Sequence, residues 1–264
     1  MTNSVKKQVL NMRVDESLVI HPLYTLLKLT PAAGESLPEI LPGQFVEVAV
    51  PDAPHTFLRR PISVNFVERD SNRLWLLIRR AGEGTARLCD TPQGAVLNIM
   101  LPLGNGFTIP SDPNCKPLLV GGGVGVAPLL MLGKELQREG FEPAFLLGAR
   151  SRADLLQIDL FEQYGKVYIT TDDGSYGHHG FVTQHPLWEH CDYNMVYCCG
   201  PAPMMKGIAR IASSLGIECE VSLENMMACG LGACLCCVEN TVKGNVCVCT
   251  EGPVFNIKQL TWPI

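Results

Sequence analysis

The hydrophobic pattern of the chain changes at Lys116, and this change constrains the fold more than any other feature of the sequence. Before it, from Val5 to about Pro110, short runs of β-forming residues alternate with turn residues. Strands at such regular spacing predict a barrel or a sandwich. A short helix is expected at 84–89, with Thr85 as its cap. The clearest predicted strands are 45–50, 62–67, 74–78 and 96–100.

After Lys116, apolar strands alternate with segments of helical spacing, which predicts a parallel sheet covered on both faces. The predicted strands are 117–120, 144–147, 167–170 and 195–198, and the predicted helices are 127–140, 154–164 and 202–215. The last segment is rich in Cys and Gly and has too little apolar periodicity to fold alone. We therefore expect an all-β barrel over 1–110, an α/β domain over 111–219 and a small Cys-rich segment over 220–264.

Composition excludes several classes of protein. Of the 264 residues, 47% are apolar and 18% are charged, so the chain can bury a core. The net charge of −5, without a basic run, offers no footprint for nucleic acid. No apolar stretch is long enough to span a membrane, and the first residues lack the apolar core of a signal peptide. We therefore expect a cytoplasmic protein.

The densest chemical signal is a run of cysteines near the end of the chain. Cys229, Cys234 and Cys237 have the spacing C-x₄-C-x₂-C, and Cys249 follows twelve residues later. This is the spacing of a plant-type [2Fe–2S] site. The alternative is a four-cysteine zinc site, but zinc usually takes paired C-x₂-C units. Two further cysteines, Cys236 and Cys247, lie beside predicted ligands and leave the ligand assignment open.

Two turns in the predicted α/β domain follow apolar strands. The first contains Gly123, Gly125 and Pro128, and a glycine-rich turn that opens a helix can receive a pyrophosphate on backbone N–H groups. A plain tight connection explains it equally well. The second contains Cys199 and Gly200 at the carboxyl end of a strand, where ligands bind in open α/β sheets. Its alternative is a buried cysteine that fills the core.

A further pattern lies in the predicted barrel. Arg59 and Arg60 precede Pro61-Ile62-Ser63, and Gly84-Thr85 opens the predicted helix. An arginine, a small hydroxyl and a helix start could together hold a diphosphate. On local chemistry alone, a solvated arginine pair beside a turn is the better explanation.

In this order, the signals resemble a ferredoxin–NADP reductase-type flavoprotein, and most closely the electron-transfer subunits of B-type dihydroorotate dehydrogenases. The segments that carry the resemblance are 60–63, 77–79, 84–85, 103–107, 123–128, 199–201, 223–230 and 249–255. The last two, Leu-Glu-Asn-Met-Met-Ala-Cys-Gly and Cys-Thr-Glu-Gly-Pro-Val-Phe, are the most specific. The resemblance covers nearly the whole chain.

The resemblance implies a role for each matching residue. Cys199 would stand beside the nicotinamide as the catalytic residue, and the iron ligands would be Cys229, Cys234, Cys237 and Cys249. Ile62 replaces an aromatic residue of the wider family, so flavin packing by that side chain is not implied. The implied cofactor-binding residues are Arg60, Pro61, Ile62, Ser63, Leu77, Ile78, Arg79, Gly84, Thr85, Gly123, Gly125, Pro128 and Gly200.

The resemblance also implies the cofactors FAD, NAD and a [2Fe–2S] cluster. Electrons would pass from dihydroorotate to the FMN of a partner catalytic subunit, then to the cluster, to FAD and to NAD⁺, in pyrimidine biosynthesis. Two chains of each kind would form a heterotetramer. One alternative is an NAD(P)-reductase subunit of a hydrogenase or of a ferredoxin-linked transhydrogenase. The other is a non-redox nucleotide-binding module with structural zinc.

Overall fold

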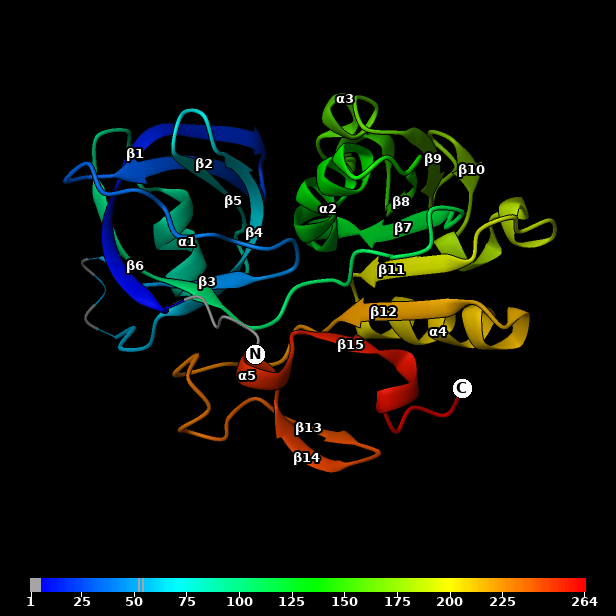
Figure 1. The fold of residues 1–264 in the computed structure, drawn as a ribbon. Helices are drawn as coiled ribbons and strands as arrows, with labels where there is room; N and C mark the ends of the chain where they lie inside the picture. Colours follow the sequence, from blue (N-terminus) through cyan, green and yellow to red (C-terminus); the bar gives the residue numbers. More distant parts are fainter. Residues whose placement is uncertain (1–5, 52, 54) are drawn as a thin grey trace.

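The computed structural model describes residues 6–51, 53 and 55–264. The predicted start of the barrel at Val5, and the rest of 1–5, therefore lie outside the described residues. The described chain forms a barrel, a second domain built on a sheet, and a small C-terminal segment beneath both (Figure 1).

The barrel is closed and antiparallel. Its strands are β1 (Gln8–His21), β2 (Tyr24–Pro31), β3 (Phe45–Val48), β4 (Arg60–Glu68), β5 (Arg73–Arg79) and β6 (Val96–Leu103). They close in the order β1-β2-β5-β4-β3-β6. The four predicted strands are confirmed, although β3 ends two residues earlier than expected, before the turn at Pro51. The predicted short helix is α1 (Glu83–Cys89).

The cap of α1 differs from the prediction. The residue before the helix is Gly82, and Thr85 lies inside the first turn. The Thr85 hydroxyl accepts hydrogen bonds from the backbone N–H groups of Ala81 and Gly82, at 2.9 and 3.1 Å. Thr85 is therefore the third residue of the helix and stabilises its start as the N3 residue of a capping box does. The cap is Gly82, three residues before the predicted cap.

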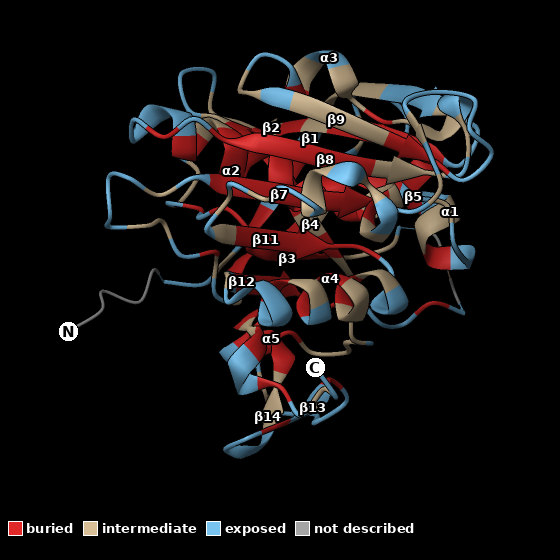
Figure 2. Ribbon diagram, turned by 90° about the vertical axis from the view of Figure 1, so that its right-hand side faces the viewer, coloured by how far each residue is buried: buried red, intermediate tan, exposed pale blue. Residues whose placement is uncertain are grey.

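The second domain is a mainly parallel sheet, as predicted. Its parallel strands are β7 (Pro117–Gly122), β8 (Ala144–Ala149), β9 (Lys166–Thr171), β10 (His178–His179), β11 (Met195–Cys199) and β12 (Glu218–Ser222). They lie in the order β10-β9-β8-β7-β11-β12. Helix α2 (Ala127–Arg138) packs with one face of the sheet and α4 (Ala202–Leu215) with the other. Figure 2 shows the buried strands of the sheet and the exposed outer face of α4, whereas α2 is buried along most of its length.

One predicted helix is wrong. The segment 154–164 contains only a 3₁₀ turn (Arg152–Asp154) and the four-residue α3 (Ile158–Phe161). Leu155 is extended, and Gln157 adopts the left-handed conformation with φ 56° and ψ 26°. A left-handed non-glycine residue cannot continue an α-helix. The segment has the apolar spacing of a helix, but the helical conformation is interrupted at Gln157, whose side chain is directed toward the barrel.

The C-terminal segment contains α5 (Val248–Glu251), a hairpin of β13 (Val238–Thr241) and β14 (Gly244–Cys247), and β15 (Val254–Asn256). Strand β15 pairs antiparallel with β12 and completes one edge of the sheet. Strand β12 itself crosses the predicted boundary between 219 and 220. The segment is therefore built onto the second domain, which explains how so little apolar sequence is ordered. The boundaries of the three parts stay a prediction.

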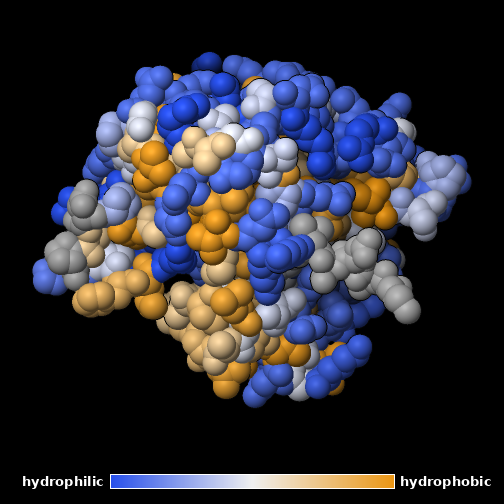
Figure 3. Space-filling model, turned by 60° about the vertical axis from the view of Figure 1, so that its left-hand side comes forward, coloured by the Kyte–Doolittle hydropathy of each residue, from blue (hydrophilic) through white to orange (hydrophobic). Residues whose placement is uncertain are grey.

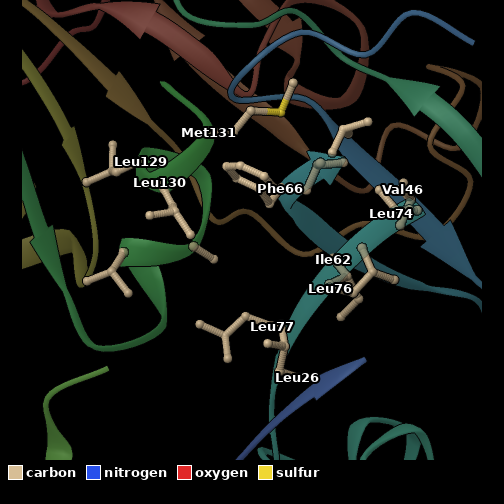
Figure 4. Packing of buried hydrophobic residues seen from close by; sticks show 14 of the residues in the cluster. Leu26, Val46, Ile62, Phe66, Leu74, Leu76, Leu77, Leu129, Leu130 and Met131 are labelled. Atoms are coloured by element: carbon tan, nitrogen blue, oxygen red, sulfur yellow. The ribbon is translucent and has the colours of Figure 1, made fainter. Parts of the chain in front are cut away.

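The barrel and the sheet domain meet along an apolar seam between β4 and α2. Phe66 of β4 lies between barrel residues such as Val46 and Leu74 and the α2 residues Leu130 and Met131 (Figure 4). All of these side chains are buried. Burial of apolar side chains is favourable but not directional, so polar contacts must fix how the two domains are aligned.

Candidate functional site

The segment 60–63 of β4, which resembles a flavin-binding motif, lies directly against the start of α1. A Cβ placed on Gly84 would lie 2.4 Å from the Arg60 Nε atom, so the guanidinium occupies the space above this glycine. Arg60 is held there by its own Nη1 group, which donates to the backbone oxygens of Leu58 and Arg59. A fixed guanidinium beside a helix start is a suitable receptor for a diphosphate. The structure therefore brings together two patterns that are far apart in the sequence.

The remaining predicted residues of the barrel are placed differently from one another. Pro61 and Ser63 are partly exposed on β4, and Ile62 between them is buried. On β5, the side chains of Leu77 and Ile78 are buried in the barrel, and Arg79 is exposed at the strand end. In the segment 77–79, only the Arg79 side chain and the backbone groups are therefore available to contact a cofactor.

The glycine-rich turn and the Cys-Gly-Pro turn are packed against each other. A Cβ on Gly125 would lie 2.5 Å from both the Cys199 carbonyl oxygen and the Gly200 Cα atom. Gly125 is therefore required for close approach of the two backbones. Gly123 has a φ of 57° and faces the Tyr24 hydroxyl of the barrel at a distance that leaves room. Pro128 is buried in the first turn of α2. The two turns form one surface that faces the barrel.

Cys199 ends β11 within this surface and is 1% exposed. Burial raises the pKa of its thiol well above 9, so the thiol is neutral near pH 7. The nearby Ser222 side chain lowers the pKa of this thiol slightly, whereas the charge of Glu224 raises it further. Burial also raises the pKa of Glu224, while the positive charge of Arg79 acts in the opposite direction. The sequence analysis missed Ser222 and Glu224, although Glu224 lies in the most specific matching segment.

The four predicted iron ligands lie on one loop and on the adjoining helix α5. Backbone N–H groups point at three of the sulfurs: Leu231 at Cys229 Sγ (3.3 Å), Gly232 at Cys249 Sγ (3.2 Å), and Cys249 at Cys237 Sγ (3.4 Å). Hydrogen bonds from the loop backbone, with that of Leu231 first, lower the pKa of Cys229 to about 6. N–H donors directed at sulfur favour the thiolate form that binds iron.

Two glycines allow this loop to curl. Gly230 and Gly232 have φ values of 66° and 80°, in the left-handed region that glycine adopts at low cost. The two additional cysteines have different surroundings: Cys236 is exposed, and the Cys247 thiol is directed toward the Gly232 carbonyl at 3.9 Å. Within the described residues, no three His, Cys, Asp or Glu side chains are gathered around a single metal position. The donor set and its N–H contacts fit a thiolate-bound iron–sulfur cluster.

The end of the barrel is hydrogen-bonded to the segment that follows Cys249. The side-chain amide of Asn105 donates to the backbone oxygens of Thr250 and Glu251, each at 3.0 Å. A Cβ on Gly104 would lie 2.6 Å from Pro253 Cδ. The segment 103–107, at the end of the barrel, therefore contacts and supports the segment that carries Cys249.

A buried carboxyl group lies at the junction of the barrel and the cluster loop. Glu47 of β3 has no exposed area, and neither of its carboxylate oxygens has a hydrogen-bond partner among the described residues. A Cβ on Gly230 would lie 2.9 Å from Glu47 Cγ. Burial raises the pKa of Glu47 to about 7, against the opposing charge of Arg59. No pattern in the sequence indicates a special role for Glu47, because it occupies an ordinary position in a predicted strand.

The cluster loop also carries exposed apolar side chains. Met226, Leu231 and Leu235, which we call the loop face, are 82%, 47% and 64% exposed. Figure 3 shows hydrophobic side chains gathered on the lower part of this side of the molecule. Exposed apolar groups in one place are typical of protein–protein contact sites.

Comparison with known proteins defines the class. Residues 119–210 match the oxidoreductase NAD-binding domain, and residues 224–261 match the iron–sulfur cluster binding domain of dihydroorotate dehydrogenase B. Among solved structures, the NADH-dependent reduced ferredoxin–NADP oxidoreductase has a TM-score of 0.85 at 27% identity, covering 95% of this chain and 90% of that one. Phthalate dioxygenase reductase shares the fold, with a TM-score of 0.63 at 22% identity over 89% and 87% of the two chains. The chain is an oxidoreductase of the ferredoxin-reductase fold with a C-terminal iron–sulfur segment.

Curated relatives narrow this class to one family. The dihydroorotate dehydrogenase B (NAD⁺) electron transfer subunit of Shouchella clausii is 36% identical, over 89% of this chain and 96% of that protein. The subunit of the same name from Desulforamulus reducens is 41% identical, over 84% and 87%. The chain belongs to the family of dihydroorotate dehydrogenase B (NAD⁺) electron transfer subunits. In the described part of the chain, no helix combines the length and hydrophobicity needed to cross a membrane.

Proposed function

We propose that the chain transfers electrons between a dihydroorotate-oxidising catalytic subunit and NAD⁺, using FAD and a [2Fe–2S] cluster. The observation that carries the proposal is the cluster loop, where backbone N–H groups point at Cys229, Cys237 and Cys249 next to a flavin-type barrel. The family match supports the same function over most of the chain. The hydrogenase, transhydrogenase and zinc-module alternatives are not favoured, because the relatives are dihydroorotate dehydrogenase subunits.

In this proposal, the flavin lies along the barrel segment around Arg60, and the nicotinamide lies against the two turns of the second domain that face the barrel. Arg60, Gly84 and Thr85 hold the FAD diphosphate, with Pro61, Ile62, Ser63, Leu77, Ile78 and Arg79 along the rest of the cofactor. Gly123, Gly125, Pro128 and Gly200 shape the nucleotide side. When bound, FAD exchanges hydride with NAD and single electrons with the cluster.

The remaining residues of the site exclude water and hold protons. Cys199 presents a neutral thiol from a buried position, so it contributes bulk and polarisability beside the nicotinamide without adding charge. Glu224 is an exposed residue beside Cys199, and desolvation by the surrounding protein raises the pKa of its carboxyl above the ordinary value. Cys229, Cys234, Cys237 and Cys249 bind the irons, and the N–H donors of the loop offset the negative charge on their sulfurs.

The partner in this proposal is an FMN-containing dihydroorotate dehydrogenase chain, arranged with this chain as a heterotetramer of two of each. The loop face presents Met226, Leu231 and Leu235 beside the exposed Cys234. A partner that covers this face would approach the cluster and remove apolar surface from water. The dihydroorotate site belongs to the partner, since this chain has a single flavin-type barrel.

The first test is a visible spectrum of anaerobically purified protein, with iron and zinc counted, before and after addition of NADH. Flavin and iron–sulfur absorbance that bleaches with NADH is expected. A colourless protein that holds one zinc per chain and cannot be reconstituted with FAD or iron would overturn the proposal. Co-expression with a dihydroorotate dehydrogenase catalytic chain then tests the partner, through dihydroorotate-dependent formation of NADH.

A further inference from the structure

Asn65 is an unusual residue for the middle of a barrel strand. It lies in β4, two residues after Ser63, and is fully buried. The pairing of β4 with β5 shifts register between Val64 and Phe66, so Asn65 is an extra residue on its strand. A bulge of this kind leaves one residue unpaired and directs its side chain away from the ordinary alternation. Here it directs the amide out of the barrel and into the seam.

Within the seam, the Asn65 side chain forms three hydrogen bonds with the other domain. Its Nδ2 atom donates to Gln157 Oε1 at 3.1 Å, and Gln157 Nε2 donates back to Asn65 Oδ1 at 2.9 Å. The same Nδ2 atom donates to the Ala127 carbonyl oxygen at 3.0 Å. Ala127 is the first residue of α2 and follows the glycine-rich turn directly. The contact thus joins the flavin-motif strand to the nucleotide turn.

Gln157 reaches this position through a backbone conformation that disfavours glutamine. Its left-handed φ and ψ bring the Cβ close to the following carbonyl oxygen, which is unfavourable for any residue other than glycine. Such outliers persist where the surroundings over-determine them. The two reciprocal hydrogen bonds with the fully buried Asn65 are the interactions that hold the half-buried Gln157 side chain there.

We propose that Asn65 and Gln157 are positioning residues that set the alignment of the flavin side with the nicotinamide side. The apolar seam supplies cohesion without direction, whereas the fully buried Asn65 amide, paired with the half-buried Gln157, is satisfied in one alignment and costly to leave unpaired in others. A misalignment of about 1 Å between reacting groups can lower a rate by roughly a hundredfold. The pair therefore acts on hydride transfer through geometry and touches neither reacting group.

This inference rests on the proposed function, and the experiment separates the two. The variants are Asn65→Ala, Gln157→Gly and the double variant, in the full chain loaded with FAD and cluster. Gln157→Gly removes the amide and suits a left-handed backbone, so it keeps the test open should Asn65→Ala fail to fold. The matched control is Gln137→Ala, because the Gln137 amide bonds only within its own domain, to the carbonyls of Gln163 and Tyr164.

Three measurements are made on each protein. Anaerobic stopped-flow absorbance gives the limiting rate of flavin reduction and the apparent Kd for NADH. The long-wavelength charge-transfer absorbance reports stacking of nicotinamide on flavin. Hydrogen–deuterium exchange reports opening of residues 60–68 and 123–131, independently of activity. For both single variants we expect a limiting rate at least about tenfold lower, weaker charge-transfer absorbance and faster exchange, with FAD content retained and Kd changed less than about threefold.

The double variant is expected to be about as slow as either single variant, because the first substitution already removes the pair. Exchanging the partners, with Asn65→Gln and Gln157→Asn together, keeps two amides and is expected to recover part of the rate. Unchanged rates and exchange in both single variants, or equal losses in Gln137→Ala, would overturn the inference. Failure of NADH to reduce the wild-type flavin would instead overturn the proposed function, while the exchange experiment would still test the pair.

Discussion

The seam between the domains and the cluster loop position redox groups by different physical means. The seam is built from regular elements, a strand and a helix, whose apolar side chains are buried on both sides. The cluster loop has little regular structure and exposed apolar side chains, and its order comes from left-handed glycines and N–H contacts to sulfur.

The two regions differ in how far apart in the sequence the residues that determine their structure lie. In the loop, three of the proposed ligands and the two left-handed glycines are close together in the sequence, so local chemistry can specify the proposed site. In the seam, the aligning contacts join residues about 90 positions apart, so they exist only after both domains have folded. The two regions should therefore respond differently to substitution.

The largest effect is expected from Cys234→Ser, which removes one proposed iron ligand from the loop. We expect loss of the cluster's electron paramagnetic resonance signal and of electron transfer to the partner, with FAD retained in the barrel. Cys236→Ser is the matched control, since Cys236 is also exposed on this loop. A cluster that survives Cys234→Ser and is lost in Cys236→Ser would reverse the ligand assignment.

Gly125→Ala tests the close backbone approach between the two turns of the second domain that face the barrel. The new Cβ would lie 2.5 Å from backbone atoms of Cys199 and Gly200, which cannot rotate away as a side chain can. We expect a loss of about 2–3 kcal/mol in the free energy of unfolding, measured by denaturant titration, and weaker nucleotide binding. Gly82→Ala is the control for stability, because a Cβ there meets no atom within 4 Å. Equal stability of the two variants would contradict the close approach.

Glu47 tests how the two regions interact electrostatically. Its pKa is raised by burial to about 7 in the folded chain, above the ordinary 4.5. The stabilising contribution of the protonated carboxyl is therefore complete below about pH 4.5 and is lost as pH rises through 7. From pH 5 to 8, the wild type should lose about 1–2 kcal/mol relative to Glu47→Gln.

Thermal unfolding of both proteins across this range checks the expectation, with Glu142→Gln as the control for an exposed carboxyl. Parallel pH profiles for the wild type and Glu47→Gln would show that the buried carboxyl has an ordinary pKa.

The smallest effect is expected from Asn105→Ala. This substitution removes two hydrogen bonds that tie the end of the barrel to Thr250 and Glu251. We expect a loss of about 1 kcal/mol, because the freed carbonyls can bind water, and a faster loss of iron to a chelator. Asn114→Ala removes only the side-chain hydrogen bond to Asp112 in a local turn and serves as the control. Equal rates of iron loss in the two variants would show that the barrel does not brace the loop.

Much of the fold could be predicted because its signals are local. The change of period at Lys116 separates a barrel from a parallel sheet, and α4 begins and ends where its apolar spacing and Gly216 indicate. The helix expected at 154–164 fails for the opposite reason. Its spacing suits a helix, but Gln157 pairs with a barrel residue, and that distant contact outweighs the local preference of the backbone.

The sequence by itself determined the chemistry of this protein: four cysteines at the spacing of a plant-type cluster, glycines where backbones must turn, and the motif around Arg60. Each depends on residues that are neighbours in the chain. Only the tertiary structure decided that Arg60 lies over Gly84, that β15 completes the sheet, that Glu47 is buried against the cluster loop, and that Asn65 pairs with Gln157. These are contacts between distant segments, and their energies depend on burial and direction that a linear pattern does not contain.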